Sequence, residues 1–73
     1  MNQAKRDKFV SLATKRVSRT IRDLRLIGNL SNRSAYTYTD EDVKKIVRAL
    51  QRELDSVRAR FNGGESGDSD FKL

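Results

Sequence analysis

Apolar and small residues recur in two stretches of this chain at alternating steps of three and four residues, the spacing of one face of an α-helix. In the first stretch these positions are Val10, Ala13, Val17, Thr20, Leu24 and Ile27. In the second stretch they are Val43, Val47, Leu50, Leu54, Val57 and Phe61. The chain contains no proline, so nothing forces a break in either helix. The spacing predicts two long helices, over about 4–28 and about 40–61, joined by a loop over 29–38.

The first helix is expected to end at Gly28 and Asn29, because both residues tolerate the left-handed conformation that is common at helix C-termini. A continuation to Leu30 or Ser31 is the alternative, at the modest cost of a glycine inside a helix. Residues 62–73 are rich in glycine, serine and acids, and this composition predicts a disordered acidic tail.

The start of the second helix carries several capping signals. Thr39 is a preferred N-cap residue, and Asp42 three residues later completes a capping box with Asp in place of the usual Glu. Residues 40–42 are all acidic, which the helix dipole favours in a first turn. Tyr38 and Val43 occupy the two positions of a hydrophobic staple. Capping explains these carboxylates better than a metal site does.

The expected fold is all-α, an antiparallel helical hairpin of two long helices. One such pair buries only one stripe from each helix. About 25 cal/mol per Å² of buried apolar surface, set against about 1.5 kcal/mol per ordered residue, leaves it close to unstable. Leu12 and Leu26 lie off the main stripe, and a second contact surface would bury them. We therefore expect a homodimer that forms a four-helix bundle, with a domain-swapped or an open two-helix dimer as variants.

The residue types exclude most catalytic chemistry. The chain has no histidine and no cysteine, which removes the usual general base, the common nucleophile pairs and the preferred zinc ligands. No glycine-rich phosphate-binding motif is present. We expect a protein that is not an enzyme, with no catalytic residue, no metal site and no cofactor. No apolar run approaches a membrane span, and the N-terminal residues lack the apolar core of a signal peptide, so a cytoplasmic location is expected.

Positive charge is concentrated in the first predicted helix. The chain has a formal net charge of +6, and residues 1–28 hold eight Lys and Arg against two acids. By helical spacing, four of these cations point within about 60° of one another, opposite the apolar stripe. They are Lys8, Lys15, Arg19 and Arg22. This pattern predicts a polyanion-binding face; an acidic protein partner and a plain solvated surface are the alternatives.

The second predicted helix mixes charges of both signs, as solvated helices generally do. On it, Glu41 and Asp55 are expected to offset Lys45, Arg48 and Arg52.

The loop between the helices combines cationic, aromatic and polar side chains. Arg33 and Tyr36, with Asn29, Asn32 and Ser34, form a mixture suited to unpaired bases. The structural alternative is that Tyr36 covers the end of the bundle.

These observations favour a small nucleic-acid-binding protein that uses the basic face of the first helix, with DNA and RNA left open. The alternative is a helical protein-interaction module, an adaptor or an inhibitor that docks on an acidic or apolar partner surface. Binding of the first helix to an anionic membrane surface is a third hypothesis. It is disfavoured because the hairpin needs the apolar face of that helix.

The stretch RLIGNLSNRSAYTYTDEDVKKI and the following ALQREL, within about residues 25–54, resemble a segment of short, basic, functionally uncharacterised bacterial proteins, some of them encoded on mobile elements. The resemblance implies a bacterial, cytoplasmic origin. It identifies no site residue.

Overall fold

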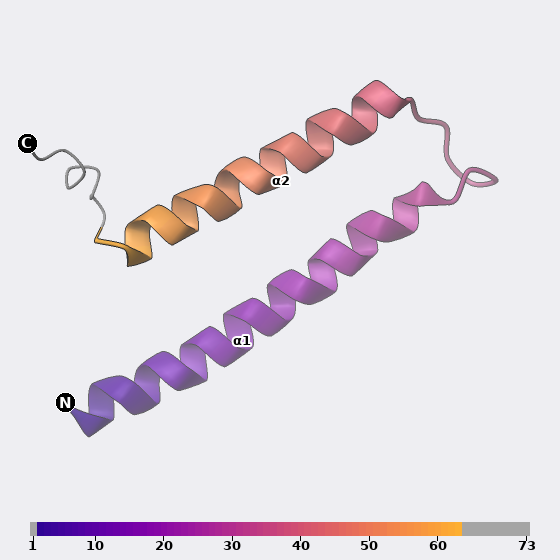
Figure 1. The fold of residues 1–73 in the computed structure, drawn as a ribbon. Coiled ribbons are helices and arrows are strands. Elements are labelled where there is room, and N and C mark those ends of the chain that lie inside the picture. Colours follow the sequence, from indigo (N-terminus) through magenta and orange to yellow (C-terminus); the bar gives the residue numbers. More distant parts are fainter. Residues whose placement is uncertain (1, 64–73) are drawn as a thin grey trace, which may run out of the picture. The chain divides into compact units, whose positions relative to one another are not determined.

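The structure is a computed structural model that describes residues 2–63 of the chain. Within that range the secondary structure is helical, and no strand occurs. Helix α1 spans Gln3–Gly28, the short 3-10 helix η1 spans Asn29–Ser31, and α2 spans Asp40–Phe61 (Figure 1). The prediction of an all-α fold with two long helices is confirmed.

The chain divides into two units. Met1–Thr37 contains α1 and η1, and Tyr38–Leu73 contains α2. Nearly all of the predicted acidic tail, at 64–73, lies outside the described residues.

Helix α1 begins at a side-chain cap that the sequence analysis did not identify. The Asn2 side chain accepts a hydrogen bond from the backbone N–H of Lys5 at 3.1 Å, as an N-cap residue does. One turn in, Gln3 Nε2 donates to the Asp7 carboxylate at 2.8 Å. The Asn2 cap thus satisfies one backbone donor of a first turn that has no acidic residue.

The end of α1 differs from the expected left-handed cap. Gly28 has φ −59° and Asn29 has φ −66°, so both residues are right-handed. The chain instead tightens into η1, and Asn32 N–H donates to the carbonyl of Asn29 at 3.4 Å. A 3-10 turn satisfies terminal carbonyls without a left-handed residue. The α-helix ends at Gly28 as expected, but the prediction of a left-handed cap was wrong, because a 3-10 turn continues the chain to Ser31.

Helix α2 begins with the predicted capping box. The Thr39 hydroxyl accepts a hydrogen bond from Asp42 N–H at 3.0 Å, and the Asp42 carboxylate accepts one from Thr39 N–H at 2.9 Å. The shorter Asp side chain therefore replaces the usual Glu without loss of either bond. Because both partners are local, the register of α2 is determined within residues 39–42.

The C-terminal end of α2 has the left-handed glycine that α1 lacks. Asn62 N–H donates to the carbonyl of Arg58 at 3.0 Å. Gly63 follows with φ 98°, a conformation that residues with a Cβ rarely adopt. Arg58 and Arg60 lie in the last turn, where the helix dipole favours positive charge.

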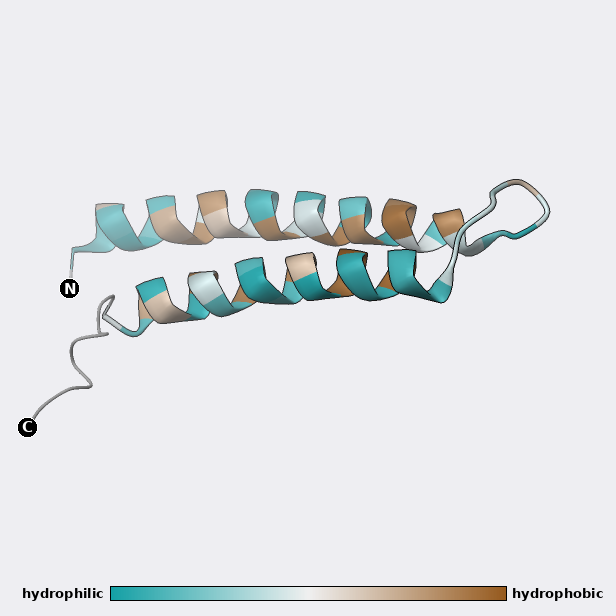
Figure 2. Ribbon diagram, turned by 90° about the horizontal axis from the view of Figure 1, so that it is seen from above, coloured by the Kyte–Doolittle hydropathy of each residue, from teal (hydrophilic) through white to brown (hydrophobic). Residues whose placement is uncertain are grey.

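The apolar residues of both helices are exposed in this structure. No residue of the described range 2–63 is buried, and only four are half-buried. These are Leu12, Ala13, Ile27 and Tyr38. Figure 2 shows hydrophobic residues recurring along each helix between hydrophilic ones. Each helix thus presents an apolar stripe, and the two stripes are the surfaces that a hairpin or a bundle would bury.

Removal of the Thr39 hydroxyl should weaken the start of α2. Thr39→Ala deletes the acceptor for Asp42 N–H, and loss of such a cap costs about 1 kcal/mol. We expect faster amide hydrogen exchange at residues 40–43, measured by NMR. Thr39→Ser is the matched control, because it keeps a hydroxyl at the same place and should exchange as the wild type does. Equal exchange in all three proteins would contradict the capping role.

The capping box should also respond to pH through Asp42. The backbone N–H of Thr39, then the Thr39 hydroxyl and the charge of Lys45, lower the pKa of Asp42 from its ordinary value of 3.8. A lowered pKa in the folded state means that this stabilisation is complete above pH 3.8 and is lost as the pH falls through the lowered value. We therefore expect the first turn of α2 to fray only when the pH falls below 3.8, as Asp42 becomes protonated.

The measurement is a pH titration of the Thr39 amide chemical shift. In Asp42→Asn, which cannot ionise, that shift should lose its acidic transition. A transition at or above pH 3.8 in the wild type would contradict the prediction.

Candidate nucleic-acid interface

The predicted basic face of α1 consists of exposed side chains in the structure. Lys8, Lys15, Arg19 and Arg22 are all exposed. Lys15, Arg19 and Arg22 line one shallow groove along the helix, together with Ser18. Lys8 lies about two turns before Lys15 and outside this groove. The structure therefore brings three of the four predicted cations to one surface, which we call the α1 groove.

The α1 groove contains a further cation that the sequence analysis left out. Arg16 is among its lining residues. By helical spacing Arg16 starts about 60° beyond Arg19, outside the arc from which the basic face was assembled. Its spacing of three residues from Arg19, a distance at which side chains on a helix are neighbours, was the signal that could have identified it. The lining residues thus include four cations and no carboxylate.

Leu12 forms the apolar part of the α1 groove. It is half-buried and shares the groove with Lys15, Arg16 and Arg19. Long basic side chains commonly lay their alkyl stems along apolar surface while their charged ends stay in water. Leu26, in contrast, is 59% exposed. The expectation that a second contact surface is needed to cover both leucines is therefore weakened for Leu12 and stands for Leu26.

The polar residues of the loop mainly hold the loop itself. The Asn32 side-chain oxygen accepts hydrogen bonds from the backbone N–H of Ser34 at 3.0 Å and from its hydroxyl at 2.6 Å. The Asn32 carbonyl accepts from Ala35 N–H at 3.1 Å and from Tyr36 N–H at 3.0 Å. This is the local side-chain turn that asparagine favours. Asn32 and Ser34, counted in the sequence as groups for base recognition, are thus engaged within the turn.

The two predicted loop contacts, Arg33 and Tyr36, lie on this same turn. Both are exposed, and the Tyr36 side chain is 50% exposed. Neither lines the α1 groove. Tyr38 is half-buried at the position of the predicted staple, one residue before the Thr39 cap. Arg33 and Tyr36 therefore lie three residues apart on the loop, and both lie outside the α1 groove.

Residues 2–63 hold no group of three or more His, Cys, Asp and Glu side chains placed to bind a metal ion. Over the same range, neither long helix has the run of apolar residues required to cross a membrane.

Comparisons with protein-family models, with curated proteins and with solved structures found no match to this chain. The function proposed for it therefore rests on its own residues.

Proposed function

We propose that this protein binds nucleic acid without catalysing a reaction, and that it contacts phosphate groups through the basic face of α1. The observation that carries the proposal is the α1 groove, whose lining residues include four cations and no carboxylate. Asp23, four residues after Arg19, lies outside this lining. Guanidinium groups bind phosphate through paired N–H donors, and a lysine ammonium adds a compact charge. Ser18, also in the groove, is small enough to allow close approach of a phosphate backbone.

The length of the basic face suits a phosphate backbone. From Lys8 to Arg22 the helix rises about 21 Å, at about 1.5 Å per residue. One strand of a duplex presents a phosphate about every 3.4 Å of the duplex axis, so a helix lying parallel to that axis would span about six phosphates. Contacts of this kind are independent of sequence, and DNA and RNA are both candidate ligands.

The loop supplies the second part of the proposal. Arg33 and Tyr36 are proposed to contact unpaired bases, because an arginine plane and a tyrosine ring both stack on a base face. The Asn32 turn supports this assignment by holding the backbone on which both residues lie. A residue on a preformed turn loses less conformational freedom on binding than one on a free chain.

We further propose that the active form is a homodimer of helical hairpins. The exposed apolar stripes of α1 and α2 support this proposal, since surfaces of this kind are stable when covered by another apolar surface. A bacterial, cytoplasmic origin, implied by the resemblance of residues 25–54, belongs to the same proposal.

The alternative function is a helical module that docks on an acidic or apolar protein partner. Leu26 favours it, because this leucine is 59% exposed and, by helical spacing, lies on the same side of α1 as the basic face. An apolar side chain among cations fits an acidic amphipathic partner better than it fits phosphates.

Charge removal from the α1 groove should weaken nucleic-acid binding and reduce its salt dependence. The test variant carries Lys15→Gln, Arg19→Gln and Arg22→Gln. Each lost phosphate contact should lower the slope of log affinity against log salt by about 0.7 to 0.9. Glutamine forms helices nearly as well as lysine and arginine, so the circular dichroism spectrum should be unchanged. The measurement is fluorescence anisotropy at several salt concentrations on short single- and double-stranded DNA and RNA.

The matched control removes the same charge from α1 outside the basic face. It carries Lys5→Gln, Arg6→Gln and Arg25→Gln, none of which lines the α1 groove, and it should lower the salt slope clearly less. An equal effect of both variants would mean that net charge, not the groove, drives binding. No binding tighter than about 100 μM to any probe at low salt would reject the proposal and favour the protein-partner alternative.

The homodimer can be tested by placing a charge in the apolar stripe of α2. Leu50→Asp should unfold the protein, because an unpaired charge in a covered interface costs several kcal/mol. Ser56→Asp adds the same charge about 120° away on the helix and should remain folded. Helix content is measured by circular dichroism and mass by sedimentation. A stable, fully helical wild-type monomer at micromolar concentration would contradict the dimer.

A further inference from the structure

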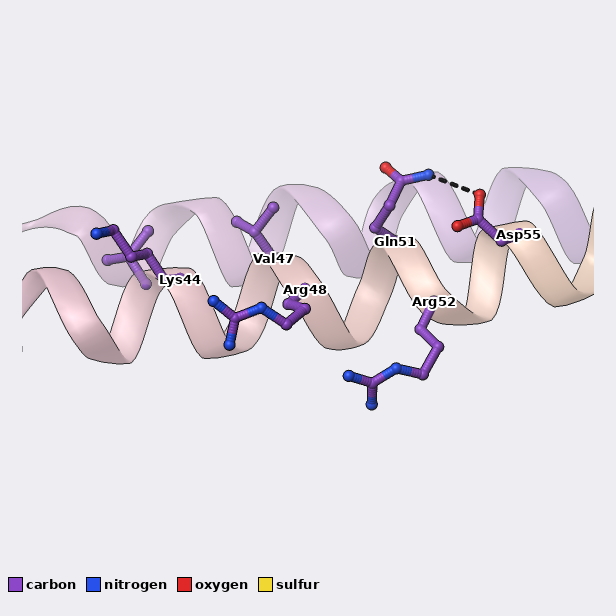
Figure 3. A pocket seen from close by; sticks show the side chains of 7 residues that line it. Lys44, Val47, Arg48, Gln51, Arg52 and Asp55 are labelled. Atoms are coloured by element: carbon purple, nitrogen blue, oxygen red, sulfur yellow. Dashed lines mark hydrogen bonds between the residues drawn. The ribbon is translucent and has the colours of Figure 1, made fainter.

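A second row of cations lies on α2. A shallow groove on this helix is lined by Val43, Lys44, Val47, Arg48, Gln51, Arg52 and Asp55 (Figure 3). Its three cations, Lys44, Arg48 and Arg52, follow one another at intervals of four residues. Four residues of helix rise about 6 Å, and side chains at this spacing are neighbours on one side. We call these three side chains the α2 row.

Two acidic residues lie near the α2 row, Asp55 in the lining of the same groove and Glu41 in the first turn of the helix. The Asp55 carboxylate accepts a hydrogen bond from Gln51 Nε2 at 3.0 Å. Figure 3 shows the guanidinium groups of Arg48 and Arg52 directed away from Asp55. Glu41 lies at the start of α2, in the first turn, where the helix dipole already favours its charge. Arg48 and Arg52 are therefore the two guanidinium groups of the row that point away from a carboxylate.

The spacing of the row has a chemical consequence. Like charges four residues apart on a helix repel, and the α2 row contains two such pairs in succession. A line of anions with a similar repeat would remove this repulsion and would accept the N–H donors of both guanidinium groups. From Lys44 to Arg52 the helix rises about 12 Å, so the row presents one cation about every 6 Å.

We propose that the α2 row binds the phosphodiester backbone of nucleic acid as a second surface, separate from the α1 groove. This inference rests on the proposed function and extends it to the other helix. By helical spacing the cations of each surface lie off the apolar stripe of their own helix, so burial of the stripes leaves these cations accessible. Val43 and Val47 of the α2 stripe line one edge of the α2 groove. The protein then has two sets of phosphate contacts, and both contribute to the salt dependence of binding.

The test compares two double variants of α2 with equal charge loss. Arg48→Gln with Arg52→Gln removes both arginines of the row. Arg58→Gln with Arg60→Gln removes two arginines that do not line the groove. We expect the row variant to lower the salt slope by about 1.4 to 1.8, as two lost phosphate contacts should, and the control to lower it clearly less. The probes are the same short DNA and RNA strands, and circular dichroism checks that helicity is retained.

The outcomes separate this inference from the proposed function. If both α2 variants leave the slope unchanged while the α1 triple variant lowers it, the α2 row is overturned and the α1 groove stands. If the two α2 variants lower the slope equally, net charge explains the effect and the α2 row is again overturned. If the wild type binds no nucleic acid but binds poly-L-glutamate, both proposals fail and an acidic protein partner replaces them.

Discussion

The side of each helix that carries apolar residues determines which side can meet a charged ligand. In α1 and in α2 the apolar side chains recur along one stripe, and water is an unfavourable neighbour for such a stripe. Whatever surface covers it, the cations on the other side stay in contact with solvent. The α1 groove and the α2 row both lie on such sides, so the same constraint that predicts packing also selects the surfaces for binding.

Local hydrogen bonds then determine where these surfaces begin and end. The capping box at Thr39 and Asp42 starts α2 at Asp40, four residues before Lys44, and so sets the register of the α2 row. The Asn32 turn does the same for the loop, because it positions the backbone that carries Arg33 and Tyr36. Neither the capping box nor the Asn32 turn depends on hydrogen bonds to a distant part of the chain. This explains how a chain of 73 residues can place charged side chains without a buried residue in its described range.

The sequence predicted the structure best where a local pattern is compatible with only one local conformation. The start of α2 is such a case, since Thr39 and Asp42 have no equally good alternative partners. The prediction placed the end of α1 correctly at Gly28 but failed for the conformation there, because Gly28 and Asn29 permit both a left-handed cap and a 3-10 turn, and the structure has the turn. It also missed Arg16, whose Cβ lies outside the predicted arc although the side chain lines the groove. Sequence spacing locates the Cβ atom, whereas a long side chain can reach well beyond it.

The sequence by itself determined the two helices, the apolar stripe on each, the capping box and the concentration of positive charge on α1. All four follow from the backbone geometry common to every α-helix, which converts spacing along the chain into position around an axis. Only the three-dimensional structure decided which hydrogen-bond partners the polar side chains have. Asp55 accepts from Gln51, and Asn32 accepts from Ser34. Leu12 is half-buried beside the long cations of the α1 groove. Each of these choices depends on side-chain rotamers, and several rotamers are compatible with the same helical spacing.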